Sequence, residues 1–102
     1  MRLTEGRTMT FPVLHMNGTS ADGLIDPLSN AYDALNTAYE ALKQTAPNGR
    51  DYYVHRDPNA LKTATEQHMA RLRRVDEIKA ELEEIIGDIQ RQSDEKQQRR
   101  NS

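Results

Sequence analysis

A seven-residue repeat in the second half of the chain constrains the fold more than any other feature. One series of positions contains Leu61, His68, Val75, Leu82 and Ile89, and a second series three residues further on contains Ala64, Arg71, Ile78 and Ile85. This spacing is typical of the a and d positions of a coiled coil, interrupted here by the polar residues His68 and Arg71. Since Asp57 and Pro58 form a helix start signal, the pattern predicts a long helix over about residues 58–91.

The first half of the chain predicts a shorter helix over about residues 20–46. Its apolar residues advance by three or four positions, and they are Leu24, Leu28, Ala31, Leu35, Ala38 and Leu42. Thr19 or Ser20 can cap this helix, or Asp26 can cap a fresh start with Pro27 at the first helical position. The sequence leaves open whether Pro27 marks a kink or a restart. Pro47, followed by the pair Asn48-Gly49, ends the pattern.

These two helices predict an all-α fold, a long antiparallel helical hairpin over residues 20–92. Residues 1–19 carry Gly, Pro and Thr around a short apolar run and predict an extended segment, whereas residues 93–102 have no apolar residue and predict a disordered polar tail. A second helix of roughly 50 Å would extend past a first helix of about 30 to 40 Å. The part expected to overhang contains Leu82, Ile85, Ile86 and Ile89. A small chain with such a face and no Cys is expected to form a homo-oligomer.

Charge is distributed unevenly along the 102 residues, although the net charge is only -2. Residues 50–74 hold six basic and three acidic groups, whereas residues 75–95 hold two basic and eight acidic groups. The loop half of the hairpin is therefore cationic and suits a small anion better than duplex nucleic acid. The competing interpretation is a solvated face that aids antiparallel subunit docking. No run of 18 apolar residues exists, so no membrane span is expected. Glu5 and the lack of a continuous apolar core near the N-terminus argue against a signal peptide.

Chemistry-bearing residues gather in the predicted loop at residues 47–56. Tyr52 and Tyr53 offer flat faces for a nucleobase, and Arg50 can hold a phosphate with two parallel donors. The alternative is that the tyrosines close the end of the core while Arg50 and Asp51 cap helix ends. Asn48 belongs to the same turn.

Two further groups of polar residues lie outside this loop. Asn17 and Thr19 precede a helix start, where unpaired N–H groups favour negative charge, although capping alone explains a hydroxyl there. His68 and Arg71 occupy packing positions and need polar partners. The histidine spacing fits no metal site, and a phosphodiesterase that used His55 or His68 would lack a nucleophile, so we expect no catalysis, metal or cofactor.

Taken in order, several motifs resemble those of a known family. They are His15-Met16-Asn17-Gly18-Thr19, the Tyr/Ala/Leu helix from Leu24 to Leu42, Pro47-Asn48-Gly49-Arg50-Asp51-Tyr52-Tyr53 and His68-x-x-Arg71-Leu72. Together they look like the phage anti-Thoeris and anti-CBASS cyclic-nucleotide sponges, and are more similar to the anti-Thoeris branch. The resemblance covers about residues 13–90, and Gly23 and Pro27 depart from the smoother helix expected of that family.

The resemblance implies a helical hairpin that assembles into a homo-oligomer, often a hexamer, in the cytoplasm of the infected bacterial host. Such a protein binds cyclic ADP-ribose isomers or cyclic di- and trinucleotides without cleaving them, and needs no cofactor, duplex nucleic acid or membrane. Carried over by position, the implied ligand-binding residues are Asn17, Thr19, Asn48, Arg50, Asp51, Tyr52, Tyr53, His68 and Arg71. The alternative is a structural or adaptor coiled coil with no small ligand.

Overall fold

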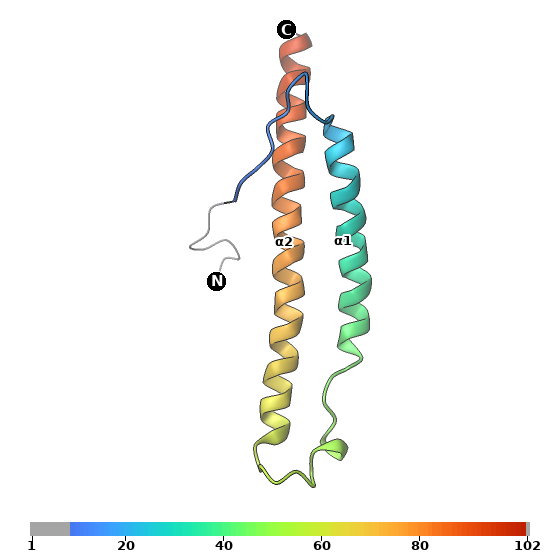
Figure 1. Ribbon diagram of the computed structural model, residues 1–102, viewed down its shortest axis with the longest axis vertical. Helices are drawn as coiled ribbons and strands as arrows, with labels where there is room; N and C mark the ends of the chain where they lie inside the picture. Colours follow the sequence, from blue (N-terminus) through green and yellow to red (C-terminus); the bar gives the residue numbers. More distant parts are fainter. Residues whose placement is uncertain (1–8, 102) are drawn as a thin grey trace.

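The computed structural model describes residues 9–101, which form a rod of 69 × 27 × 21 Å (Figure 1). Helix α1 (Ala21–Lys43) and helix α2 (Ala60–Asn101) run antiparallel, joined by a loop that contains the short 3-10 helix η1 (Gly49–Asp51). Within the described residues no strand forms, so the predicted all-α hairpin is confirmed. Neither helix is long and apolar enough to cross a membrane within this part of the chain.

Helix α1 is one continuous helix, which answers the question left open at Pro27. Ser20 is its N-cap, and its Oγ accepts a hydrogen bond from the Gly23 N–H at 3.0 Å. Pro27 lies in the second turn, where its ring removes only one backbone hydrogen bond. The helix ends at Lys43, three residues earlier than predicted, because the N–H groups of Gln44 and Thr45 bond back into the last turn.

Helix α2 continues to Asn101, so the prediction of a disordered tail after Arg91 is wrong for residues 93–101. Bonds between residues four positions apart hold these turns, from Arg91 to Glu95 at 3.0 Å and from Gln90 to Asp94 at 3.1 Å. A run of polar residues with good helix propensity can thus extend a helix that packing has already nucleated.

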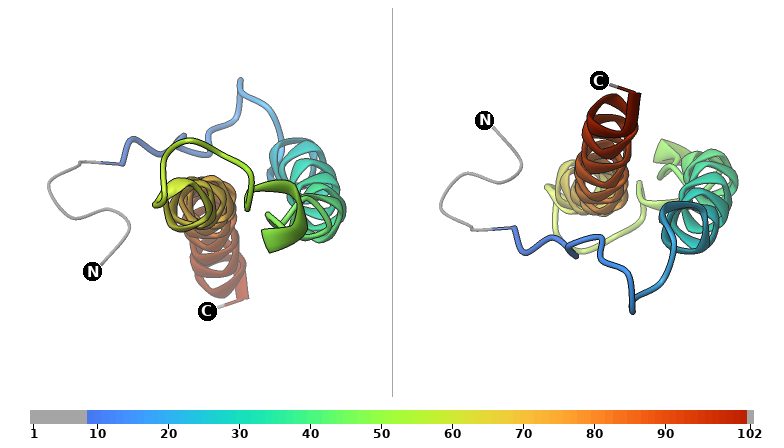
Figure 2. Two further views of the ribbon diagram at one scale, coloured as in Figure 1. Left: turned by 90° about the horizontal axis from the view of Figure 1, so that it is seen from below. Right: turned by 90° about the horizontal axis from the view of Figure 1, so that it is seen from above.

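The described part of the N-terminal segment, residues 9–20, is an irregular strap that runs beside the far end of α2 before α1 begins (Figures 1 and 2). Residues 1–8 of the predicted extended segment lie outside the described residues. We call the end of the rod where the strap, the start of α1 and the last turns of α2 meet the strap end, and the opposite end the loop end.

The face of α2 that packs on α1 differs in part from the predicted seam. The first series packs from His68 onwards, since His68 and Ile89 are buried and Val75 and Leu82 are half-buried, whereas Leu61 is exposed. The second series packs less well, because Arg71 and Ile78 are exposed and Ala64 and Ile85 are only half-buried. Residues four positions after the first series replace it, and they are Leu72, Lys79 and Ile86.

Lys79 shows how a charged residue fits this interface. Its ammonium lies 5.5 Å from the centroid of the Tyr32 ring and 5.2 Å from that of Tyr39, with Asp76 at 3.8 Å. The two tyrosines are seven residues, or about two helical turns, apart on α1, so Lys79 lies between them and helps fix the register of the two helices.

The prediction that α2 has an apolar overhang is wrong. Leu82, Ile85 and Ile86 are half-buried and Ile89 is fully buried, because α1 and the strap cover this region. The overhanging turns of α2 are polar instead. Even so, the core of the isolated chain is thin, since among residues 9–101 only Ala60, Leu72, Ile89 and His68 are buried.

Candidate functional site

The loop end is a compact turn organised by Asn48. Its Oδ1 accepts a hydrogen bond from the Arg50 N–H at 2.8 Å, and its backbone oxygen accepts from the Asp51 N–H at 3.0 Å. The Tyr52 and Tyr53 N–H groups both bond to the Gly49 oxygen. Asn48 therefore shapes the turn, and its amide oxygen is already engaged.

The remaining predicted residues of the loop end differ in exposure. Arg50 and Asp51 are exposed, Tyr52 is half-buried and Tyr53 is 81% exposed. Half-burial of Tyr52 agrees in part with its alternative role of closing the core. Because Arg50 and Tyr53 are both exposed in this turn, the turn offers a stacking surface and phosphate donors.

His68 and Arg71 lie within the first turns of α2, away from the loop. His68 is only 4% exposed, and its Nδ1 has no hydrogen-bond partner among the described residues. Arg71 is exposed. The two side chains therefore face different surroundings, one inside the hairpin interface and the other in solvent.

Asn17 and Thr19 lie at the strap end. The strap turns sharply here, since the Gly18 N–H donates to the His15 oxygen at 3.1 Å. A Cβ at Gly18 would come within 2.7 Å of the His15 ring, so any larger residue would require that ring to move. At Gly49 a Cβ would meet only an ordinary contact, so the loop turn does not depend on glycine in the same way.

Thr19 lines a hollow of about 200 Å³ between the strap, the start of α1 and the end of α2. Lys96 and Arg100 line the same hollow, together with His15 and Ser93, and no carboxylate among residues 9–101 belongs to its lining. The positive end of the α1 dipole lies here with Asp22 in its first turn, and so does the negative end of the α2 dipole. The two cationic side chains of the lining are therefore what favours an anion in this hollow.

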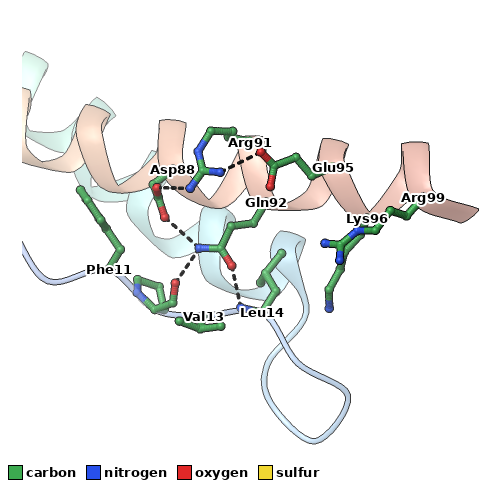
Figure 3. A pocket seen from close by; sticks show the side chains of 10 residues that line it. Phe11, Val13, Leu14, Asp88, Arg91, Gln92, Glu95, Lys96 and Arg99 are labelled. Atoms are coloured by element: carbon green, nitrogen blue, oxygen red, sulfur yellow. Dashed lines mark hydrogen bonds and ion pairs between the residues drawn. The ribbon is translucent and has the colours of Figure 1, made fainter.

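A larger hollow of about 510 Å³ lies on the other side of the strap (Figure 3). Gln92 holds its two walls together, because its Oε1 accepts from the Leu14 N–H at 2.9 Å and its Nε2 donates to the Pro12 oxygen at 2.8 Å. The same Nε2 donates to Asp88 at 2.8 Å. Hydrogen bonds from Arg91 and Gln92 lower the pKa of the Asp88 carboxyl.

The predicted site residues thus fall into three groups: the loop end, the first turns of α2, and the strap end. The loop and strap ends lie at opposite ends of a rod 69 Å long, so one chain does not bring them together. The sequence analysis does not predict roles for Lys96 and Arg100, because they fall in the predicted disordered tail of residues 93–102. It does not predict the role of Gln92 either, because the partners of Gln92 lie about 80 residues away in the sequence. The repeated four-residue pairing of Gln90 with Asp94 and Arg91 with Glu95 is the signal that could have found this part of the helix.

No family model matches the chain, and no curated protein or solved structure is similar enough to count as a match. Within residues 9–101 no group of three or more His, Asp or Glu side chains could hold a metal ion. The rod exposes Arg50 and the Tyr53 ring at its loop end, and Lys96 and Arg100 line a hollow at its strap end.

Proposed function

We propose that the protein is a phage immune-evasion protein that sequesters cyclic nucleotide second messengers without cleaving them. The ligands would be cyclic ADP-ribose isomers or cyclic di- and trinucleotides, held in the cytoplasm of the infected bacterial host by a homo-oligomer such as a hexamer. Sequestration lowers the free signal below the level that activates a Thoeris or CBASS effector, which requires affinity and abundance but no turnover.

The observation that carries the proposal is that one turn of the loop end exposes both Arg50 and Tyr53. A cyclic nucleotide presents phosphates and flat bases at short range, and a turn that exposes a guanidinium and an aromatic ring complements both. The second support is the hollow at the strap end, where Lys96 and Arg100 lie beside Thr19. Neither place supplies an activated nucleophile, so binding is the chemistry that these residues favour.

The proposal is tested by incubating the protein with each ligand class, isolating the complex, digesting the protein and identifying the released molecule by mass spectrometry. Recovery of the intact ring supports sequestration, and recovery of a linear product contradicts it. Binding at a hundred times the dissociation constant should also stabilise the fold by about 2.7 kcal/mol in a thermal-shift assay.

Arg50→Ala should weaken this binding while the oligomer keeps its size, and Arg50→Lys should weaken it less because it retains the charge. Arg74→Ala is the matched control, since Arg74 is an exposed cation on α2 outside both ends. Equal losses in Arg50→Ala and Arg74→Ala would show that binding depends on overall charge.

The second candidate function is an adaptor that binds a protein through its helices. The exposed Met69 and Ile78 on α2 favour it. A protein that shows no thermal shift with any cyclic nucleotide would support the adaptor instead.

A further inference from the structure

One side of α2 is shaped differently in its two halves. A stripe with alternating spacings of four and three residues runs along this side of the helix and contains Lys62, Glu66, Met69, Arg73, Asp76, Ala80, Glu83, Gly87, Gln90 and Asp94. Near the loop end the stripe carries Met69, which is 47% exposed, and the cations Lys62 and Arg73. Towards the strap end it carries the small residues Ala80 and Gly87 and the acids Glu83 and Asp94.

The strap-end half of the stripe borders a groove between the helices. This groove of about 440 Å³ has Tyr32, Ile86 and Gly87 in its lining, with Asp33 and Glu83 as its two acidic residues. A Cβ built on Gly87 would meet nothing within 4 Å, so the groove is open at this point. Glycine in the middle of a helix costs about 0.5 to 1 kcal/mol relative to alanine, and no contact among residues 9–101 requires it here.

We infer that the groove is filled by Met69 of a second copy of this chain, in an antiparallel pair whose two-fold axis passes near residue 78 of each α2. In that register Met69 of one chain lies against Gly87 of the other. Arg73 then lies level with Glu83, and Lys62 with Asp94. A two-fold axis repeats every contact, so the face is complementary to itself.

Charge selects the antiparallel arrangement over the parallel one. A parallel pair would place each cation level with its own copy and each acid likewise, which is unfavourable. In the antiparallel register no like charges of the stripe oppose one another, because Glu66 lies level with Gln90 and Asp76 with Ala80. A single hairpin has a thin core, so it would be stabilised by a second copy that covers its half-buried apolar residues.

The pairing rests on the oligomeric part of the proposed function and adds a consequence for its site. Ala60 of one chain lies level with Lys96 of the other, so the loop end of each hairpin comes level with the strap end of its partner. The loop end brings Arg50, and the strap end brings Lys96 and Arg100. Arg50 of one chain and the Lys96 and Arg100 pair of the other would together offer cations to a compact phosphate ring at that level.

Cysteine cross-linking tests the pairing directly, because the chain has no cysteine of its own. A mixture of Met69→Cys and Gly87→Cys chains should form a cross-linked heterodimer under mild oxidation, with no ligand present. Each variant alone should give no cross-link, because two copies of residue 69 would lie about 27 Å apart, far beyond disulfide reach. Cross-linking of either variant to itself would indicate a parallel pair and overturn the inference.

A second test separates pairing from folding. Gly87→Leu fills the groove, so it should raise helix content by circular dichroism and at the same time weaken association, measured by light scattering. Arg73→Glu should weaken association by about tenfold or more, and adding Glu83→Arg should restore it. Arg74→Glu is the control that should leave association nearly unchanged.

If the purified protein remains a monomer of 11.7 kDa, the pairing is overturned. That result is expected if the natural occupant of the groove is a different protein. If the protein binds a cyclic nucleotide but residues 69 and 87 do not cross-link, sequestration is retained and the antiparallel pair is rejected. If residues 69 and 87 cross-link but no cyclic nucleotide binds, the pair is retained and sequestration is rejected.

Discussion

The two ends of the hairpin are built from different kinds of contact. At the loop end the hydrogen bonds join near neighbours, as between Asn48 and Arg50, and the surface is largely exposed. At the strap end Gln92 bonds to Leu14 and Pro12 across 78 and 80 residues of sequence, and Ile89 nearby is fully buried. The loop end is thus a locally determined surface suited to contact with a ligand, whereas the strap end is held by tertiary packing.

The largest expected effect tests this contrast through the core. Ile89→Ala should destabilise the protein by about 2 to 5 kcal/mol, because it leaves a cavity where α1, α2 and the strap meet. Val54→Ala at the loop end should change stability by less than about 0.5 kcal/mol, since Val54 is 76% exposed. Urea denaturation at one protein concentration measures both. Similar losses in the two variants would mean that the ends do not differ in this way.

A smaller effect is expected at the strap. Gln92→Ala removes the side chain that bonds to Leu14, Pro12 and Asp88, and a hydrogen bond of this part-buried kind contributes about 0.5 to 1.5 kcal/mol. The strap should then open, and the Leu14 N–H should exchange with solvent faster in NMR. Gln90→Ala is the matched control, because the Gln90 amide bonds to Asp94 within α2 and, among residues 9–101, not to the strap. Continued protection of Leu14 in the Gln92 variant would show that apolar contacts alone hold the strap.

At the loop end we expect an effect of about 1 kcal/mol. Asn48→Ala removes the side-chain acceptor for the Arg50 N–H and should loosen the turn that carries Arg50 and Tyr53. Asn48→Asp retains an acceptor and should preserve the turn. Faster exchange of the Arg50 amide in the alanine variant alone would confirm this role, and the Leu14 amide should stay unchanged in both.

The smallest expected effect is a dependence on pH at the strap end. Hydrogen bonds from Arg91 and Gln92 lower the pKa of Asp88 below its ordinary value of 3.8. The stabilisation is therefore complete above 3.8 and is lost as the pH falls through the lowered pKa. The Leu14 amide should lose protection in that acid range in the native chain. Asp88→Asn should remove this pH dependence. If the protection of the Leu14 amide in the native chain does not change with acid, the Asp88 carboxylate does not stabilise the strap.

Much of the fold follows from local sequence signals. Ser20 and Asp57 mark the helix starts, the Asn48-Gly49 turn follows the end of the first helix, and Leu28, Leu35 and Leu42 repeat every seven residues along one side of it. The extent of α2 was underestimated because a polar sequence alone cannot nucleate a helix, whereas one that continues a packed helix adds one hydrogen bond per residue. The sequence also could not predict that Thr19 and Lys96 line the same hollow, since the two residues lie near opposite ends of the sequence.

The sequence by itself determined that this chain forms two antiparallel helices, because its apolar spacing matches the helical repeat and its caps and breakers delimit each helix. It did not determine which stripe of α2 packs on α1. The stripe through His68 and Arg71 and the stripe through His68 and Leu72 share the same average spacing, so periodicity cannot distinguish them. Only the tertiary structure decided which stripe packs, because the choice depends on how the side chains fit the surface of α1. Lys79, which lies between Tyr32 and Tyr39, is one of the side chains that fit.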